Sequence, residues 1–211
     1  AQHGTRPLER LRRLGLVGPN LIAVHAIHLT HDEIGLLVQN GSSVAHCPTS
    51  NLKFANGFAP VARMLAEGVN IGLGTDGPAS NNRLDLFQEM RQAALLAKAV
   101  SADARALPAH RALSMATLDG ARALRLDHAI GSIETGKFAD LTAIEFTAPG
   151  MLPCYDPISQ IVYAAGRENV SHVWVAGRML VENRTLKTPP KNDLENLAIL
   201  WQNRLSMETK A

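Results

Sequence analysis

Three short apolar runs, each followed by a helical pattern, recur at similar spacing in the first eighty residues. They are Leu21–Val24, Ser43–Ala45 and Val69–Gly74. Apolar runs of this length are typical of strands buried on both faces, and alternating strands and helices imply a parallel sheet. Right-handed crossovers bring the C-terminal ends of such strands to one edge. The pattern therefore predicts an α/β fold in which three strand ends share a rim.

Each predicted strand leads into a side chain that can bind a metal or exchange a proton. His25 and His46 end the first two runs, and Asp76 follows the third in VNIGLGTDGPASNN. Ligand sites of α/β barrels occupy the C-terminal ends of the strands. An ordinary turn is the alternative for Asp76, because Asp, Gly, Pro and Asn are turn formers. Three such residues on three successive strands favour a functional rim.

The remaining pattern predicts helices first and a β-rich part later. A capping box of Thr30 and Glu33 opens the helix after the first strand. Residues 49–58, TSNLKFANGF, are expected to form a loop, and long helical patterns cover 84–100, 108–115 and 118–126. Gly120 is expected to permit close packing. Beyond residue 130 we expect short strands, a hairpin over 170–181 and a final amphipathic helix.

Composition narrows the class of partner. The chain has 211 residues, of which 46% are hydrophobic and 19% charged, and its net charge is +2. The scattered charges predict no nucleic-acid surface, and no apolar run is long enough to span a bilayer. Cys47 and Cys154 lie in unrelated contexts, which favours a reducing compartment, so a cytoplasmic location is expected. The first residues lack the apolar region of a signal peptide.

Five segments in this order resemble the amidohydrolase superfamily, namely AVHAIHLTHDEI, VAHCPTSNLKFANGFAPV, NIGLGTDGPASNN, GSIETGKFADL and VWVAGRMLVEN. They look closest to the methylthioadenosine/S-adenosylhomocysteine deaminases, to which chlorohydrolases and guanine deaminases are related. The resemblance covers nearly the whole chain, and its SNLKFANG and GTDGPASNN segments are the most specific.

The resemblance implies a metal-dependent (β/α)8 barrel joined to a β-sandwich. The strands that end at His25, His46 and Asp76 would be the sixth, seventh and eighth barrel strands. Residues 1–129 would belong to the barrel, 130–190 to the sandwich and 191–211 to a C-terminal helix.

The family metal, usually Zn²⁺, is held by an HxH pair, a further His and an Asp. Of these ligands only the Asp has a counterpart here, Asp76, and the sequence contains no HxH and no HxxE motif. The resemblance therefore implies one divalent metal with an incomplete site in this chain. We expect the chain to be the C-terminal half of a longer protein.

The same resemblance assigns roles to the rim residues. Zinc lowers the pKa of its bound water to about 7, and Asp76 would bind the metal and accept the water proton. His25 would hydrogen-bond the attacked ring. Ser80 matches a substrate contact, with helix capping as an alternative, and His46 is a weaker match that a simple turn would also explain. Histidines 28 and 31 are expected to be solvated or capping residues.

Three functions remain open from the sequence. The leading hypothesis is hydrolytic deamination of an adenosine-type nucleoside, methylthioadenosine or S-adenosylhomocysteine, to the inosine product and ammonia. Guanine deamination and triazine dechlorination are the enzyme alternatives. The non-enzyme alternative is an inactive half that acts as a structural or interaction module. A small-molecule nucleoside is the expected partner, and the full-length protein is expected to be a homo-oligomer.

Overall fold

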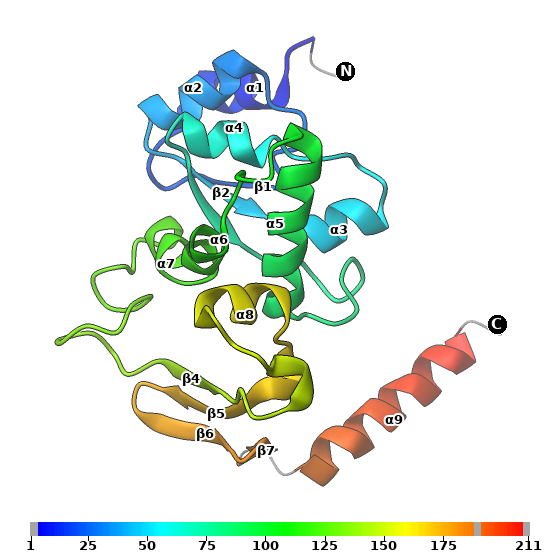
Figure 1. Cartoon of the computed structure of the whole chain (residues 1–211). Helices are drawn as coiled ribbons and strands as arrows, with labels where there is room; N and C mark the ends of the chain where they lie inside the picture. The colour runs from blue at the N-terminus through cyan, green and yellow to red at the C-terminus, as the bar shows by residue number, and fades with distance from the viewer. Residues whose placement is uncertain (1–3, 188–190, 209–211) are drawn as a thin grey trace. The chain divides into compact units, whose positions relative to one another are not determined.

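The computed structural model describes residues 4–187 and 191–208, which divide into two compact units (Figure 1). Unit 1 comprises the chain through Lys137 together with Thr147–Arg167. Unit 2 comprises Phe138–Phe146 and the chain from Glu168 onward. Each unit is described below by itself.

Unit 1 is built on a parallel three-stranded sheet of β1 (Ile22–Val24), β2 (Ser43–His46) and β3 (Asn70–Leu73), in that order. The α/β prediction is confirmed, and the three strand ends lie at one edge as expected. The helices of unit 1 are α1 (Pro7–Arg13), α2 (His31–Gln39), α3 (Pro48–Lys53), α4 (Val61–Ala66), α5 (Leu86–Ser101), α6 (Ala109–Ala116), α7 (Leu118–Ala123) and α8 (Pro157–Tyr163).

The core of unit 1 lies between the sheet and these helices. Ile34, Val44, Met64 and Ile71 have no exposed surface. Helix α7 approaches β3 so closely that a Cβ on Gly72 would lie 3.0 Å from the Cα of Gly120. The prediction that Gly120 permits close packing is therefore confirmed.

The loop expected over residues 49–58 is wrong in its first half. Residues 48–53 form helix α3, with Pro48 in the first turn, where a missing N–H is tolerated. This short helix carries no full period of apolar residues, so apolar periodicity did not predict it. The capping box of Thr30 and Glu33 on α2 is confirmed.

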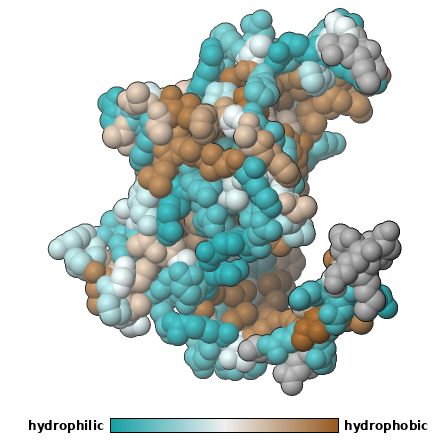
Figure 2. Space-filling model, turned by 90° about the vertical axis from the view of Figure 1, so that its right-hand side faces the viewer, coloured by the Kyte–Doolittle hydropathy of each residue, from teal (hydrophilic) through white to brown (hydrophobic). Residues whose placement is uncertain are grey.

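The sheet of unit 1 has open edges, and one face of the unit is rich in apolar side chains. Strands β1 and β3 each pair on one side only, and Figure 2 shows a broad hydrophobic area over unit 1. Edge strands and large apolar patches are typical of surfaces that contact another polypeptide. Large apolar side chains exposed on unit 1 include Leu14, Leu16, Val24, Leu52, Phe54 and Phe58.

Unit 2 is an antiparallel sheet of β4 (Leu141–Ile144), β5 (Val170–Val175), β6 (Arg178–Glu182) and β7 (Thr185–Leu186), in that order, together with α9 (Lys191–Glu208). Ala176 and Gly177 both have positive φ, as a tight hairpin requires, so the predicted hairpin is confirmed. Among the described residues, none of the helices has the length and apolarity needed to cross a membrane.

Candidate functional site

Asp76 lies three residues beyond the end of β3 and is held as an anion. Its backbone is left-handed, with φ of 61°. Its Oδ2 atom accepts hydrogen bonds from the hydroxyls of Ser50 and Ser80, each at 2.7 Å. These two bonds and the Gly77 N–H lower the pKa of Asp76 to about 2. Neutral hydroxyls therefore stabilise the charge without neutralising it.

His25 lies beside Asp76, as the shared rim predicts. It follows the last residue of β1 with a left-handed φ of 67°, and its N–H continues the parallel ladder to Ala45. The Nε2 atom is 3.7 Å from Asp76 Oδ2, and each of these two side chains is 34% exposed. On its other side, Nδ1 lies 2.8 Å from Asn51 Oδ1. A base and a carboxylate thus face one accessible point at the strand ends.

Ser80 contacts the carboxylate and does not cap a helix. The following helix, α5, begins at Leu86 and is capped by Asp85, whose carboxylate accepts from the N–H groups of Phe87 and Gln88. The capping alternative for Ser80 is therefore wrong. Its side chain is buried and its hydroxyl faces Asp76.

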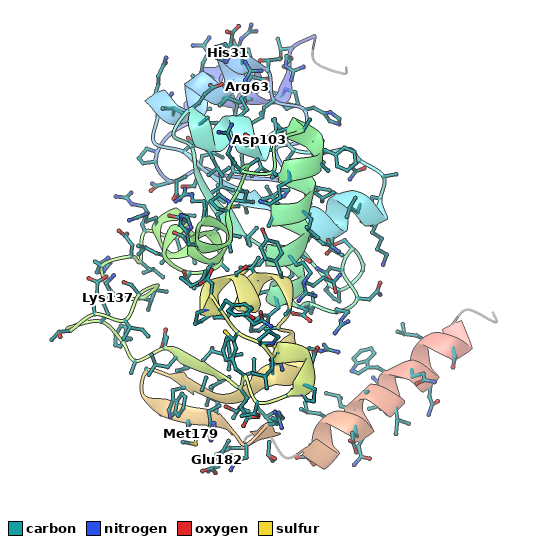
Figure 3. The ribbon with its side chains drawn as sticks, viewed as in Figure 1. His31, Arg63, Asp103, Lys137, Met179 and Glu182 are labelled. Carbon is teal, nitrogen blue, oxygen red and sulfur yellow. The ribbon has the colours of Figure 1, made fainter. Side chains whose placement is uncertain are left out.

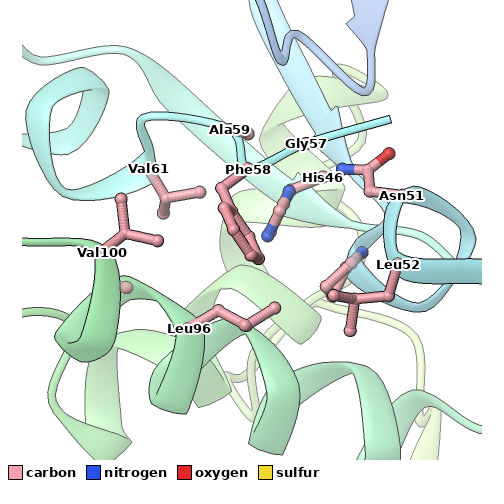
Figure 4. Close-up of a pocket in the computed structure, with 11 residues that line it drawn as sticks. His46, Asn51, Leu52, Gly57, Phe58, Ala59, Val61, Leu96 and Val100 are labelled. Carbon is pink, nitrogen blue, oxygen red and sulfur yellow. The ribbon is translucent and has the colours of Figure 1, made fainter. Parts of the chain in front are cut away.

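His46 ends β2, but its side chain is buried, with 3% of the residue exposed. Burial, together with the nearby His25, lowers the pKa of His46 to about 4, so the ring is neutral at pH 7. It lines a small cavity with Asn51, Phe58 and Leu96 (Figure 4). The structure therefore brings His25, Asp76 and Ser80 into contact, whereas His46 faces the cavity.

Sequence reasoning missed three residues that organise the rim. Ser50 and Asn51 are in the SNLKFANG segment, which we expected to be a loop. It begins with helix α3, which positions these two side chains against Asp76 and His25. Glu89 is the third: it is fully buried on α5, and burial raises its pKa. Its carboxylate accepts from the Thr49 N–H at 3.0 Å and from Asn81 Nδ2 at 2.8 Å.

Glu89 therefore fixes the chain next to both serines that hold Asp76, because Thr49 precedes Ser50 and Asn81 follows Ser80. The apolar periodicity of residues 84–100 places position 89 beside the buried Met90. That neighbour was the available signal for an internal carboxylate.

The histidines that follow His25 point elsewhere. His28 and His31 are exposed, which confirms the prediction of solvated side chains. The Nδ1 atom of His31 is 3.0 Å from Glu67 Oε1, which also pairs with Arg63 (Figure 3). These three form an ordinary surface cluster.

The rim suits part of a metal site. Asp76 and His25 provide a carboxylate oxygen and an imidazole nitrogen, both of which are zinc ligands. Within residues 4–187 and 191–208, no three side chains of His, Cys, Asp or Glu gather closely enough to hold a metal. The ionised carboxylate and open position fit one ligand of a divalent metal, and the described residues do not form a four-ligand set.

Comparison with known proteins decides the family. The model of the amidohydrolase family matches residues 1–180, which is most of the chain. The chain belongs to the amidohydrolase family. This amidohydrolase is 45% identical over 204 residues to a 5-methylthioadenosine/S-adenosylhomocysteine deaminase of Teredinibacter turnerae, covering 97% of the chain and 46% of the relative. The deaminase of the same name from Halobacterium salinarum is 46% identical over 183 residues, covering 87% of the chain and 42% of that relative.

Solved structures agree with this assignment. An adenosine deaminase from Xanthomonas campestris with bound zinc superposes with a TM-score of 0.96 at 50% identity, over 98% of this amidohydrolase and 47% of that chain. An atrazine chlorohydrolase from Arthrobacter aurescens complexed with zinc has a TM-score of 0.89 at 27% identity, over 94% and 44%. The amidohydrolase chain thus spans less than half the length of these relatives and is consistent with part of a barrel.

Proposed function

We propose that this chain carries the C-terminal half of the active site of a metal-dependent aminohydrolase. Its substrate would be an adenosine-type nucleoside, methylthioadenosine or S-adenosylhomocysteine, which water converts to the inosine product and ammonia. The observation that carries the proposal is the contact between His25 Nε2 and the ionised Asp76 at the strand ends. Names of relatives at about 45% identity support the choice of reaction.

The side chains of the rim have separable roles in this reaction. A bound divalent metal, Zn²⁺ by the proposal, would supply an acidic water, and Asp76 would be its ligand from this chain. The carboxylate of Asp76 accepts the water proton and returns it to the leaving ammonia. His25 hydrogen-bonds the purine ring where charge develops. Ser50 and Ser80 keep Asp76 oriented and ionised before the substrate arrives.

His46 and Ser80 remain proposed substrate contacts of differing directness. Ser80 already donates to Asp76, so its contact with substrate would use a lone pair of the hydroxyl oxygen as acceptor. The cavity that His46 lines supports a substrate contact for that residue.

The whole protein extends this proposal. We propose that β1, β2 and β3 are the sixth to eighth strands of a (β/α)8 barrel and that residues 130–190 contribute to a β-sandwich. The open edges of the sheet support pairing with the rest of the barrel. A cytoplasmic homo-oligomer that acts on a small nucleoside completes the proposal.

Triazine dechlorination is the second candidate, because 94% of this chain superposes on the atrazine chlorohydrolase. Guanine deamination uses the same chemistry. If the metal ligands are never completed, the chain would act only as a structural module.

The test uses the chain alone and the chain co-expressed with the portion of the Teredinibacter turnerae relative that precedes the matched region. Zinc content and ammonia release from S-adenosylhomocysteine are measured for both. We expect no tightly held zinc and no turnover from the chain alone, and zinc with turnover from the pair. Stoichiometric zinc and turnover in the chain alone would contradict the half-site. A folded, zinc-loaded pair that deaminates guanine or dechlorinates a triazine, and not nucleosides, would replace the substrate.

A further inference from the structure

The carboxamide of Asn51 lies between the two histidines of the rim. Its Oδ1 atom is 2.8 Å from His25 Nδ1. Figure 4 shows the amide nitrogen directed toward the imidazole of His46 and the oxygen turned away from it. Asn51 is 3% exposed, so water at the surface does not satisfy its polar atoms. The oxygen of the carboxamide is therefore held by His25, and its nitrogen is directed toward His46.

Both side chains carry an unsatisfied buried polar atom within the described residues. Asn51 Nδ2 and His46 Nδ1 are both buried, and neither has a hydrogen-bond partner there. A buried donor or acceptor without a partner destabilises the folded state, and such groups are therefore paired in most native structures. The two side chains line the same small cavity.

We propose that Asn51 is a positioning residue that fixes the tautomer of His25, and that His46 fixes the orientation of Asn51 because its Nδ1 atom accepts from the amide nitrogen. The amide oxygen only accepts, so His25 Nδ1 carries the proton whenever that oxygen faces it. The unprotonated Nε2 of a neutral His25 then faces Asp76 and the open rim. Proton exchange is thereby confined to the nitrogen beside Asp76.

His46 is suited to this role because its ring is neutral. A charged imidazole donates at both nitrogens and would present a proton to the amide nitrogen of Asn51. Burial excludes that form at neutral pH, which leaves Nδ1 as an acceptor when Nε2 carries the proton. Reversing the amide would set its oxygen against this lone pair. His46 thus favours the amide orientation in which the Asn51 oxygen accepts from His25 Nδ1.

The importance of this device for catalysis rests on the proposed function of His25, but its geometry is tested without turnover. The imidazole ¹⁵N signals of the 211-residue chain, labelled at histidine, are recorded at pH 8, where an ordinary histidine is neutral. We expect His25 as a single tautomer protonated at Nδ1. Asn51→Asp keeps an acceptor and should preserve this tautomer, whereas Asn51→Leu should give a mixture of both.

The His46 half has its own pair of variants. His46→Gln supplies an acceptor oxygen and should keep the His25 tautomer, whereas His46→Leu should release the amide and give the mixture. His31→Leu, on the surface, is the matched control and should change nothing at His25. Circular dichroism confirms that each variant is folded, and the isosteric Asn51→Asp and His46→Gln variants keep the comparison interpretable if a leucine variant is not.

Each result decides the proposal. An unchanged His25 signal in folded Asn51→Leu overturns the positioning role, and an unchanged signal in His46→Leu overturns the part played by His46. Loss of the tautomer in His46→Gln or Asn51→Asp also contradicts it. In the co-expressed pair, Asn51→Leu should lower kcat roughly 10-fold to 100-fold with a smaller change in KM. If the unaltered pair is inactive while the tautomer pattern holds, the proposed function fails and the positioning inference stands.

Discussion

Two aspartates near opposite ends of β3 are held in opposite ways. Asp76 follows the end of the strand, is partly exposed and is bound by two serine hydroxyls. Asp119 of α7 lies beside the start of the strand, where its carbonyl accepts from Asn70. Its carboxylate is 1% exposed and pairs with Arg111 at 2.9 Å and Arg122 at 2.8 Å.

The difference supports the proposal that Asp76 is a functional charge, whereas Asp119 is a structural one. Two arginines neutralise Asp119, so it has no free valence for a ligand. Hydroxyls stabilise Asp76 while leaving its charge available to a cation or a proton. This division follows the general rule that the C-terminal ends of barrel strands carry chemistry and the opposite ends carry stability. The variants below test that division, from the largest expected effect to the smallest.

Removing the Asp119 carboxylate should have the largest effect on stability. Asp119→Ala removes the buried acceptor of two guanidinium groups and of the Ser114 hydroxyl, and we expect a loss of roughly 3 kcal/mol in the free energy of unfolding. The arginines are 35% and 48% exposed, which places this at the low end for broken buried pairs. Urea titration measures the loss. Asp76→Ala is the comparison, and an equal or larger loss there would erase the distinction.

Removing the Glu89 carboxylate should weaken the support of Asp76. Glu89→Leu leaves the Thr49 N–H and Asn81 Nδ2 without an acceptor, and we expect a loss of about 2 kcal/mol. Glu89→Gln retains one acceptor and should lose about half as much. Urea titration again gives the values, and Glu67→Gln at the surface should leave the midpoint unchanged. A Glu89→Leu protein as stable as the original would show that these loops are held by other contacts.

Acid should weaken the fold through His46 before it reaches Asp76. The pKa of His46 is about 4 when folded against about 6.5 when unfolded, so the unfolded chain binds more protons between these values. The contribution of His46 to the free energy of unfolding is therefore fully present above pH 6.5. It is lost progressively as the pH falls from 6.5 to 4.

Between pH 7 and pH 5 the expected loss from His46 is about 2 kcal/mol. Asp76 has a lowered pKa of about 2, so its contribution is lost only between about pH 3.8 and 2. Urea titrations at pH 7 and pH 5 measure the change, and His46→Gln should remove most of it. If His46→Gln loses as much stability between pH 7 and pH 5 as the original protein, other groups cause the acid sensitivity.

The smallest effect is expected at the serines. Ser50→Ala and Ser80→Ala each remove a hydroxyl donor from Asp76, so the pKa of Asp76 should rise toward its ordinary value. Carbon NMR of the Asp76 carboxyl follows this titration, and unfolding midpoints at pH 7 should fall slightly, because each hydroxyl supplies part of the stability linked to the lowered pKa. Ser132→Ala, distant in sequence and bonded to Glu134 instead of Asp76, is the control. An unchanged Asp76 titration in both site variants would show that the hydroxyls do not set its charge.

The sequence predicted the parts of this site that depend on strand order. Three apolar runs were enough to place His25 and Asp76 together, because parallel strands have one C-terminal edge. The sequence did not predict contacts between residues far apart in the chain, because no periodic pattern marks them. Glu89 bonds a backbone N–H forty residues away, and a charged residue in an apolar helix gives no local sign of its partner.

Local structure that is too short for periodicity was also missed. Helix α3 has six residues, so its start at Pro48 was the only sign that Ser50 and Asn51 would point at the rim. His46 shows the same limit: its position in β2 was predictable, but the burial of its ring depends on packing against Phe58 and α5.

The central claim is that Asp76 is the metal ligand that this chain contributes. Zinc content of the co-expressed pair, measured by atomic emission for the original sequence and for Asp76→Asn, tests it most directly. The account predicts about one zinc per pair in the original and a large loss in Asp76→Asn, with both pairs folded by circular dichroism. Full zinc occupancy in Asp76→Asn, with ammonia still released from S-adenosylhomocysteine, would contradict the claim.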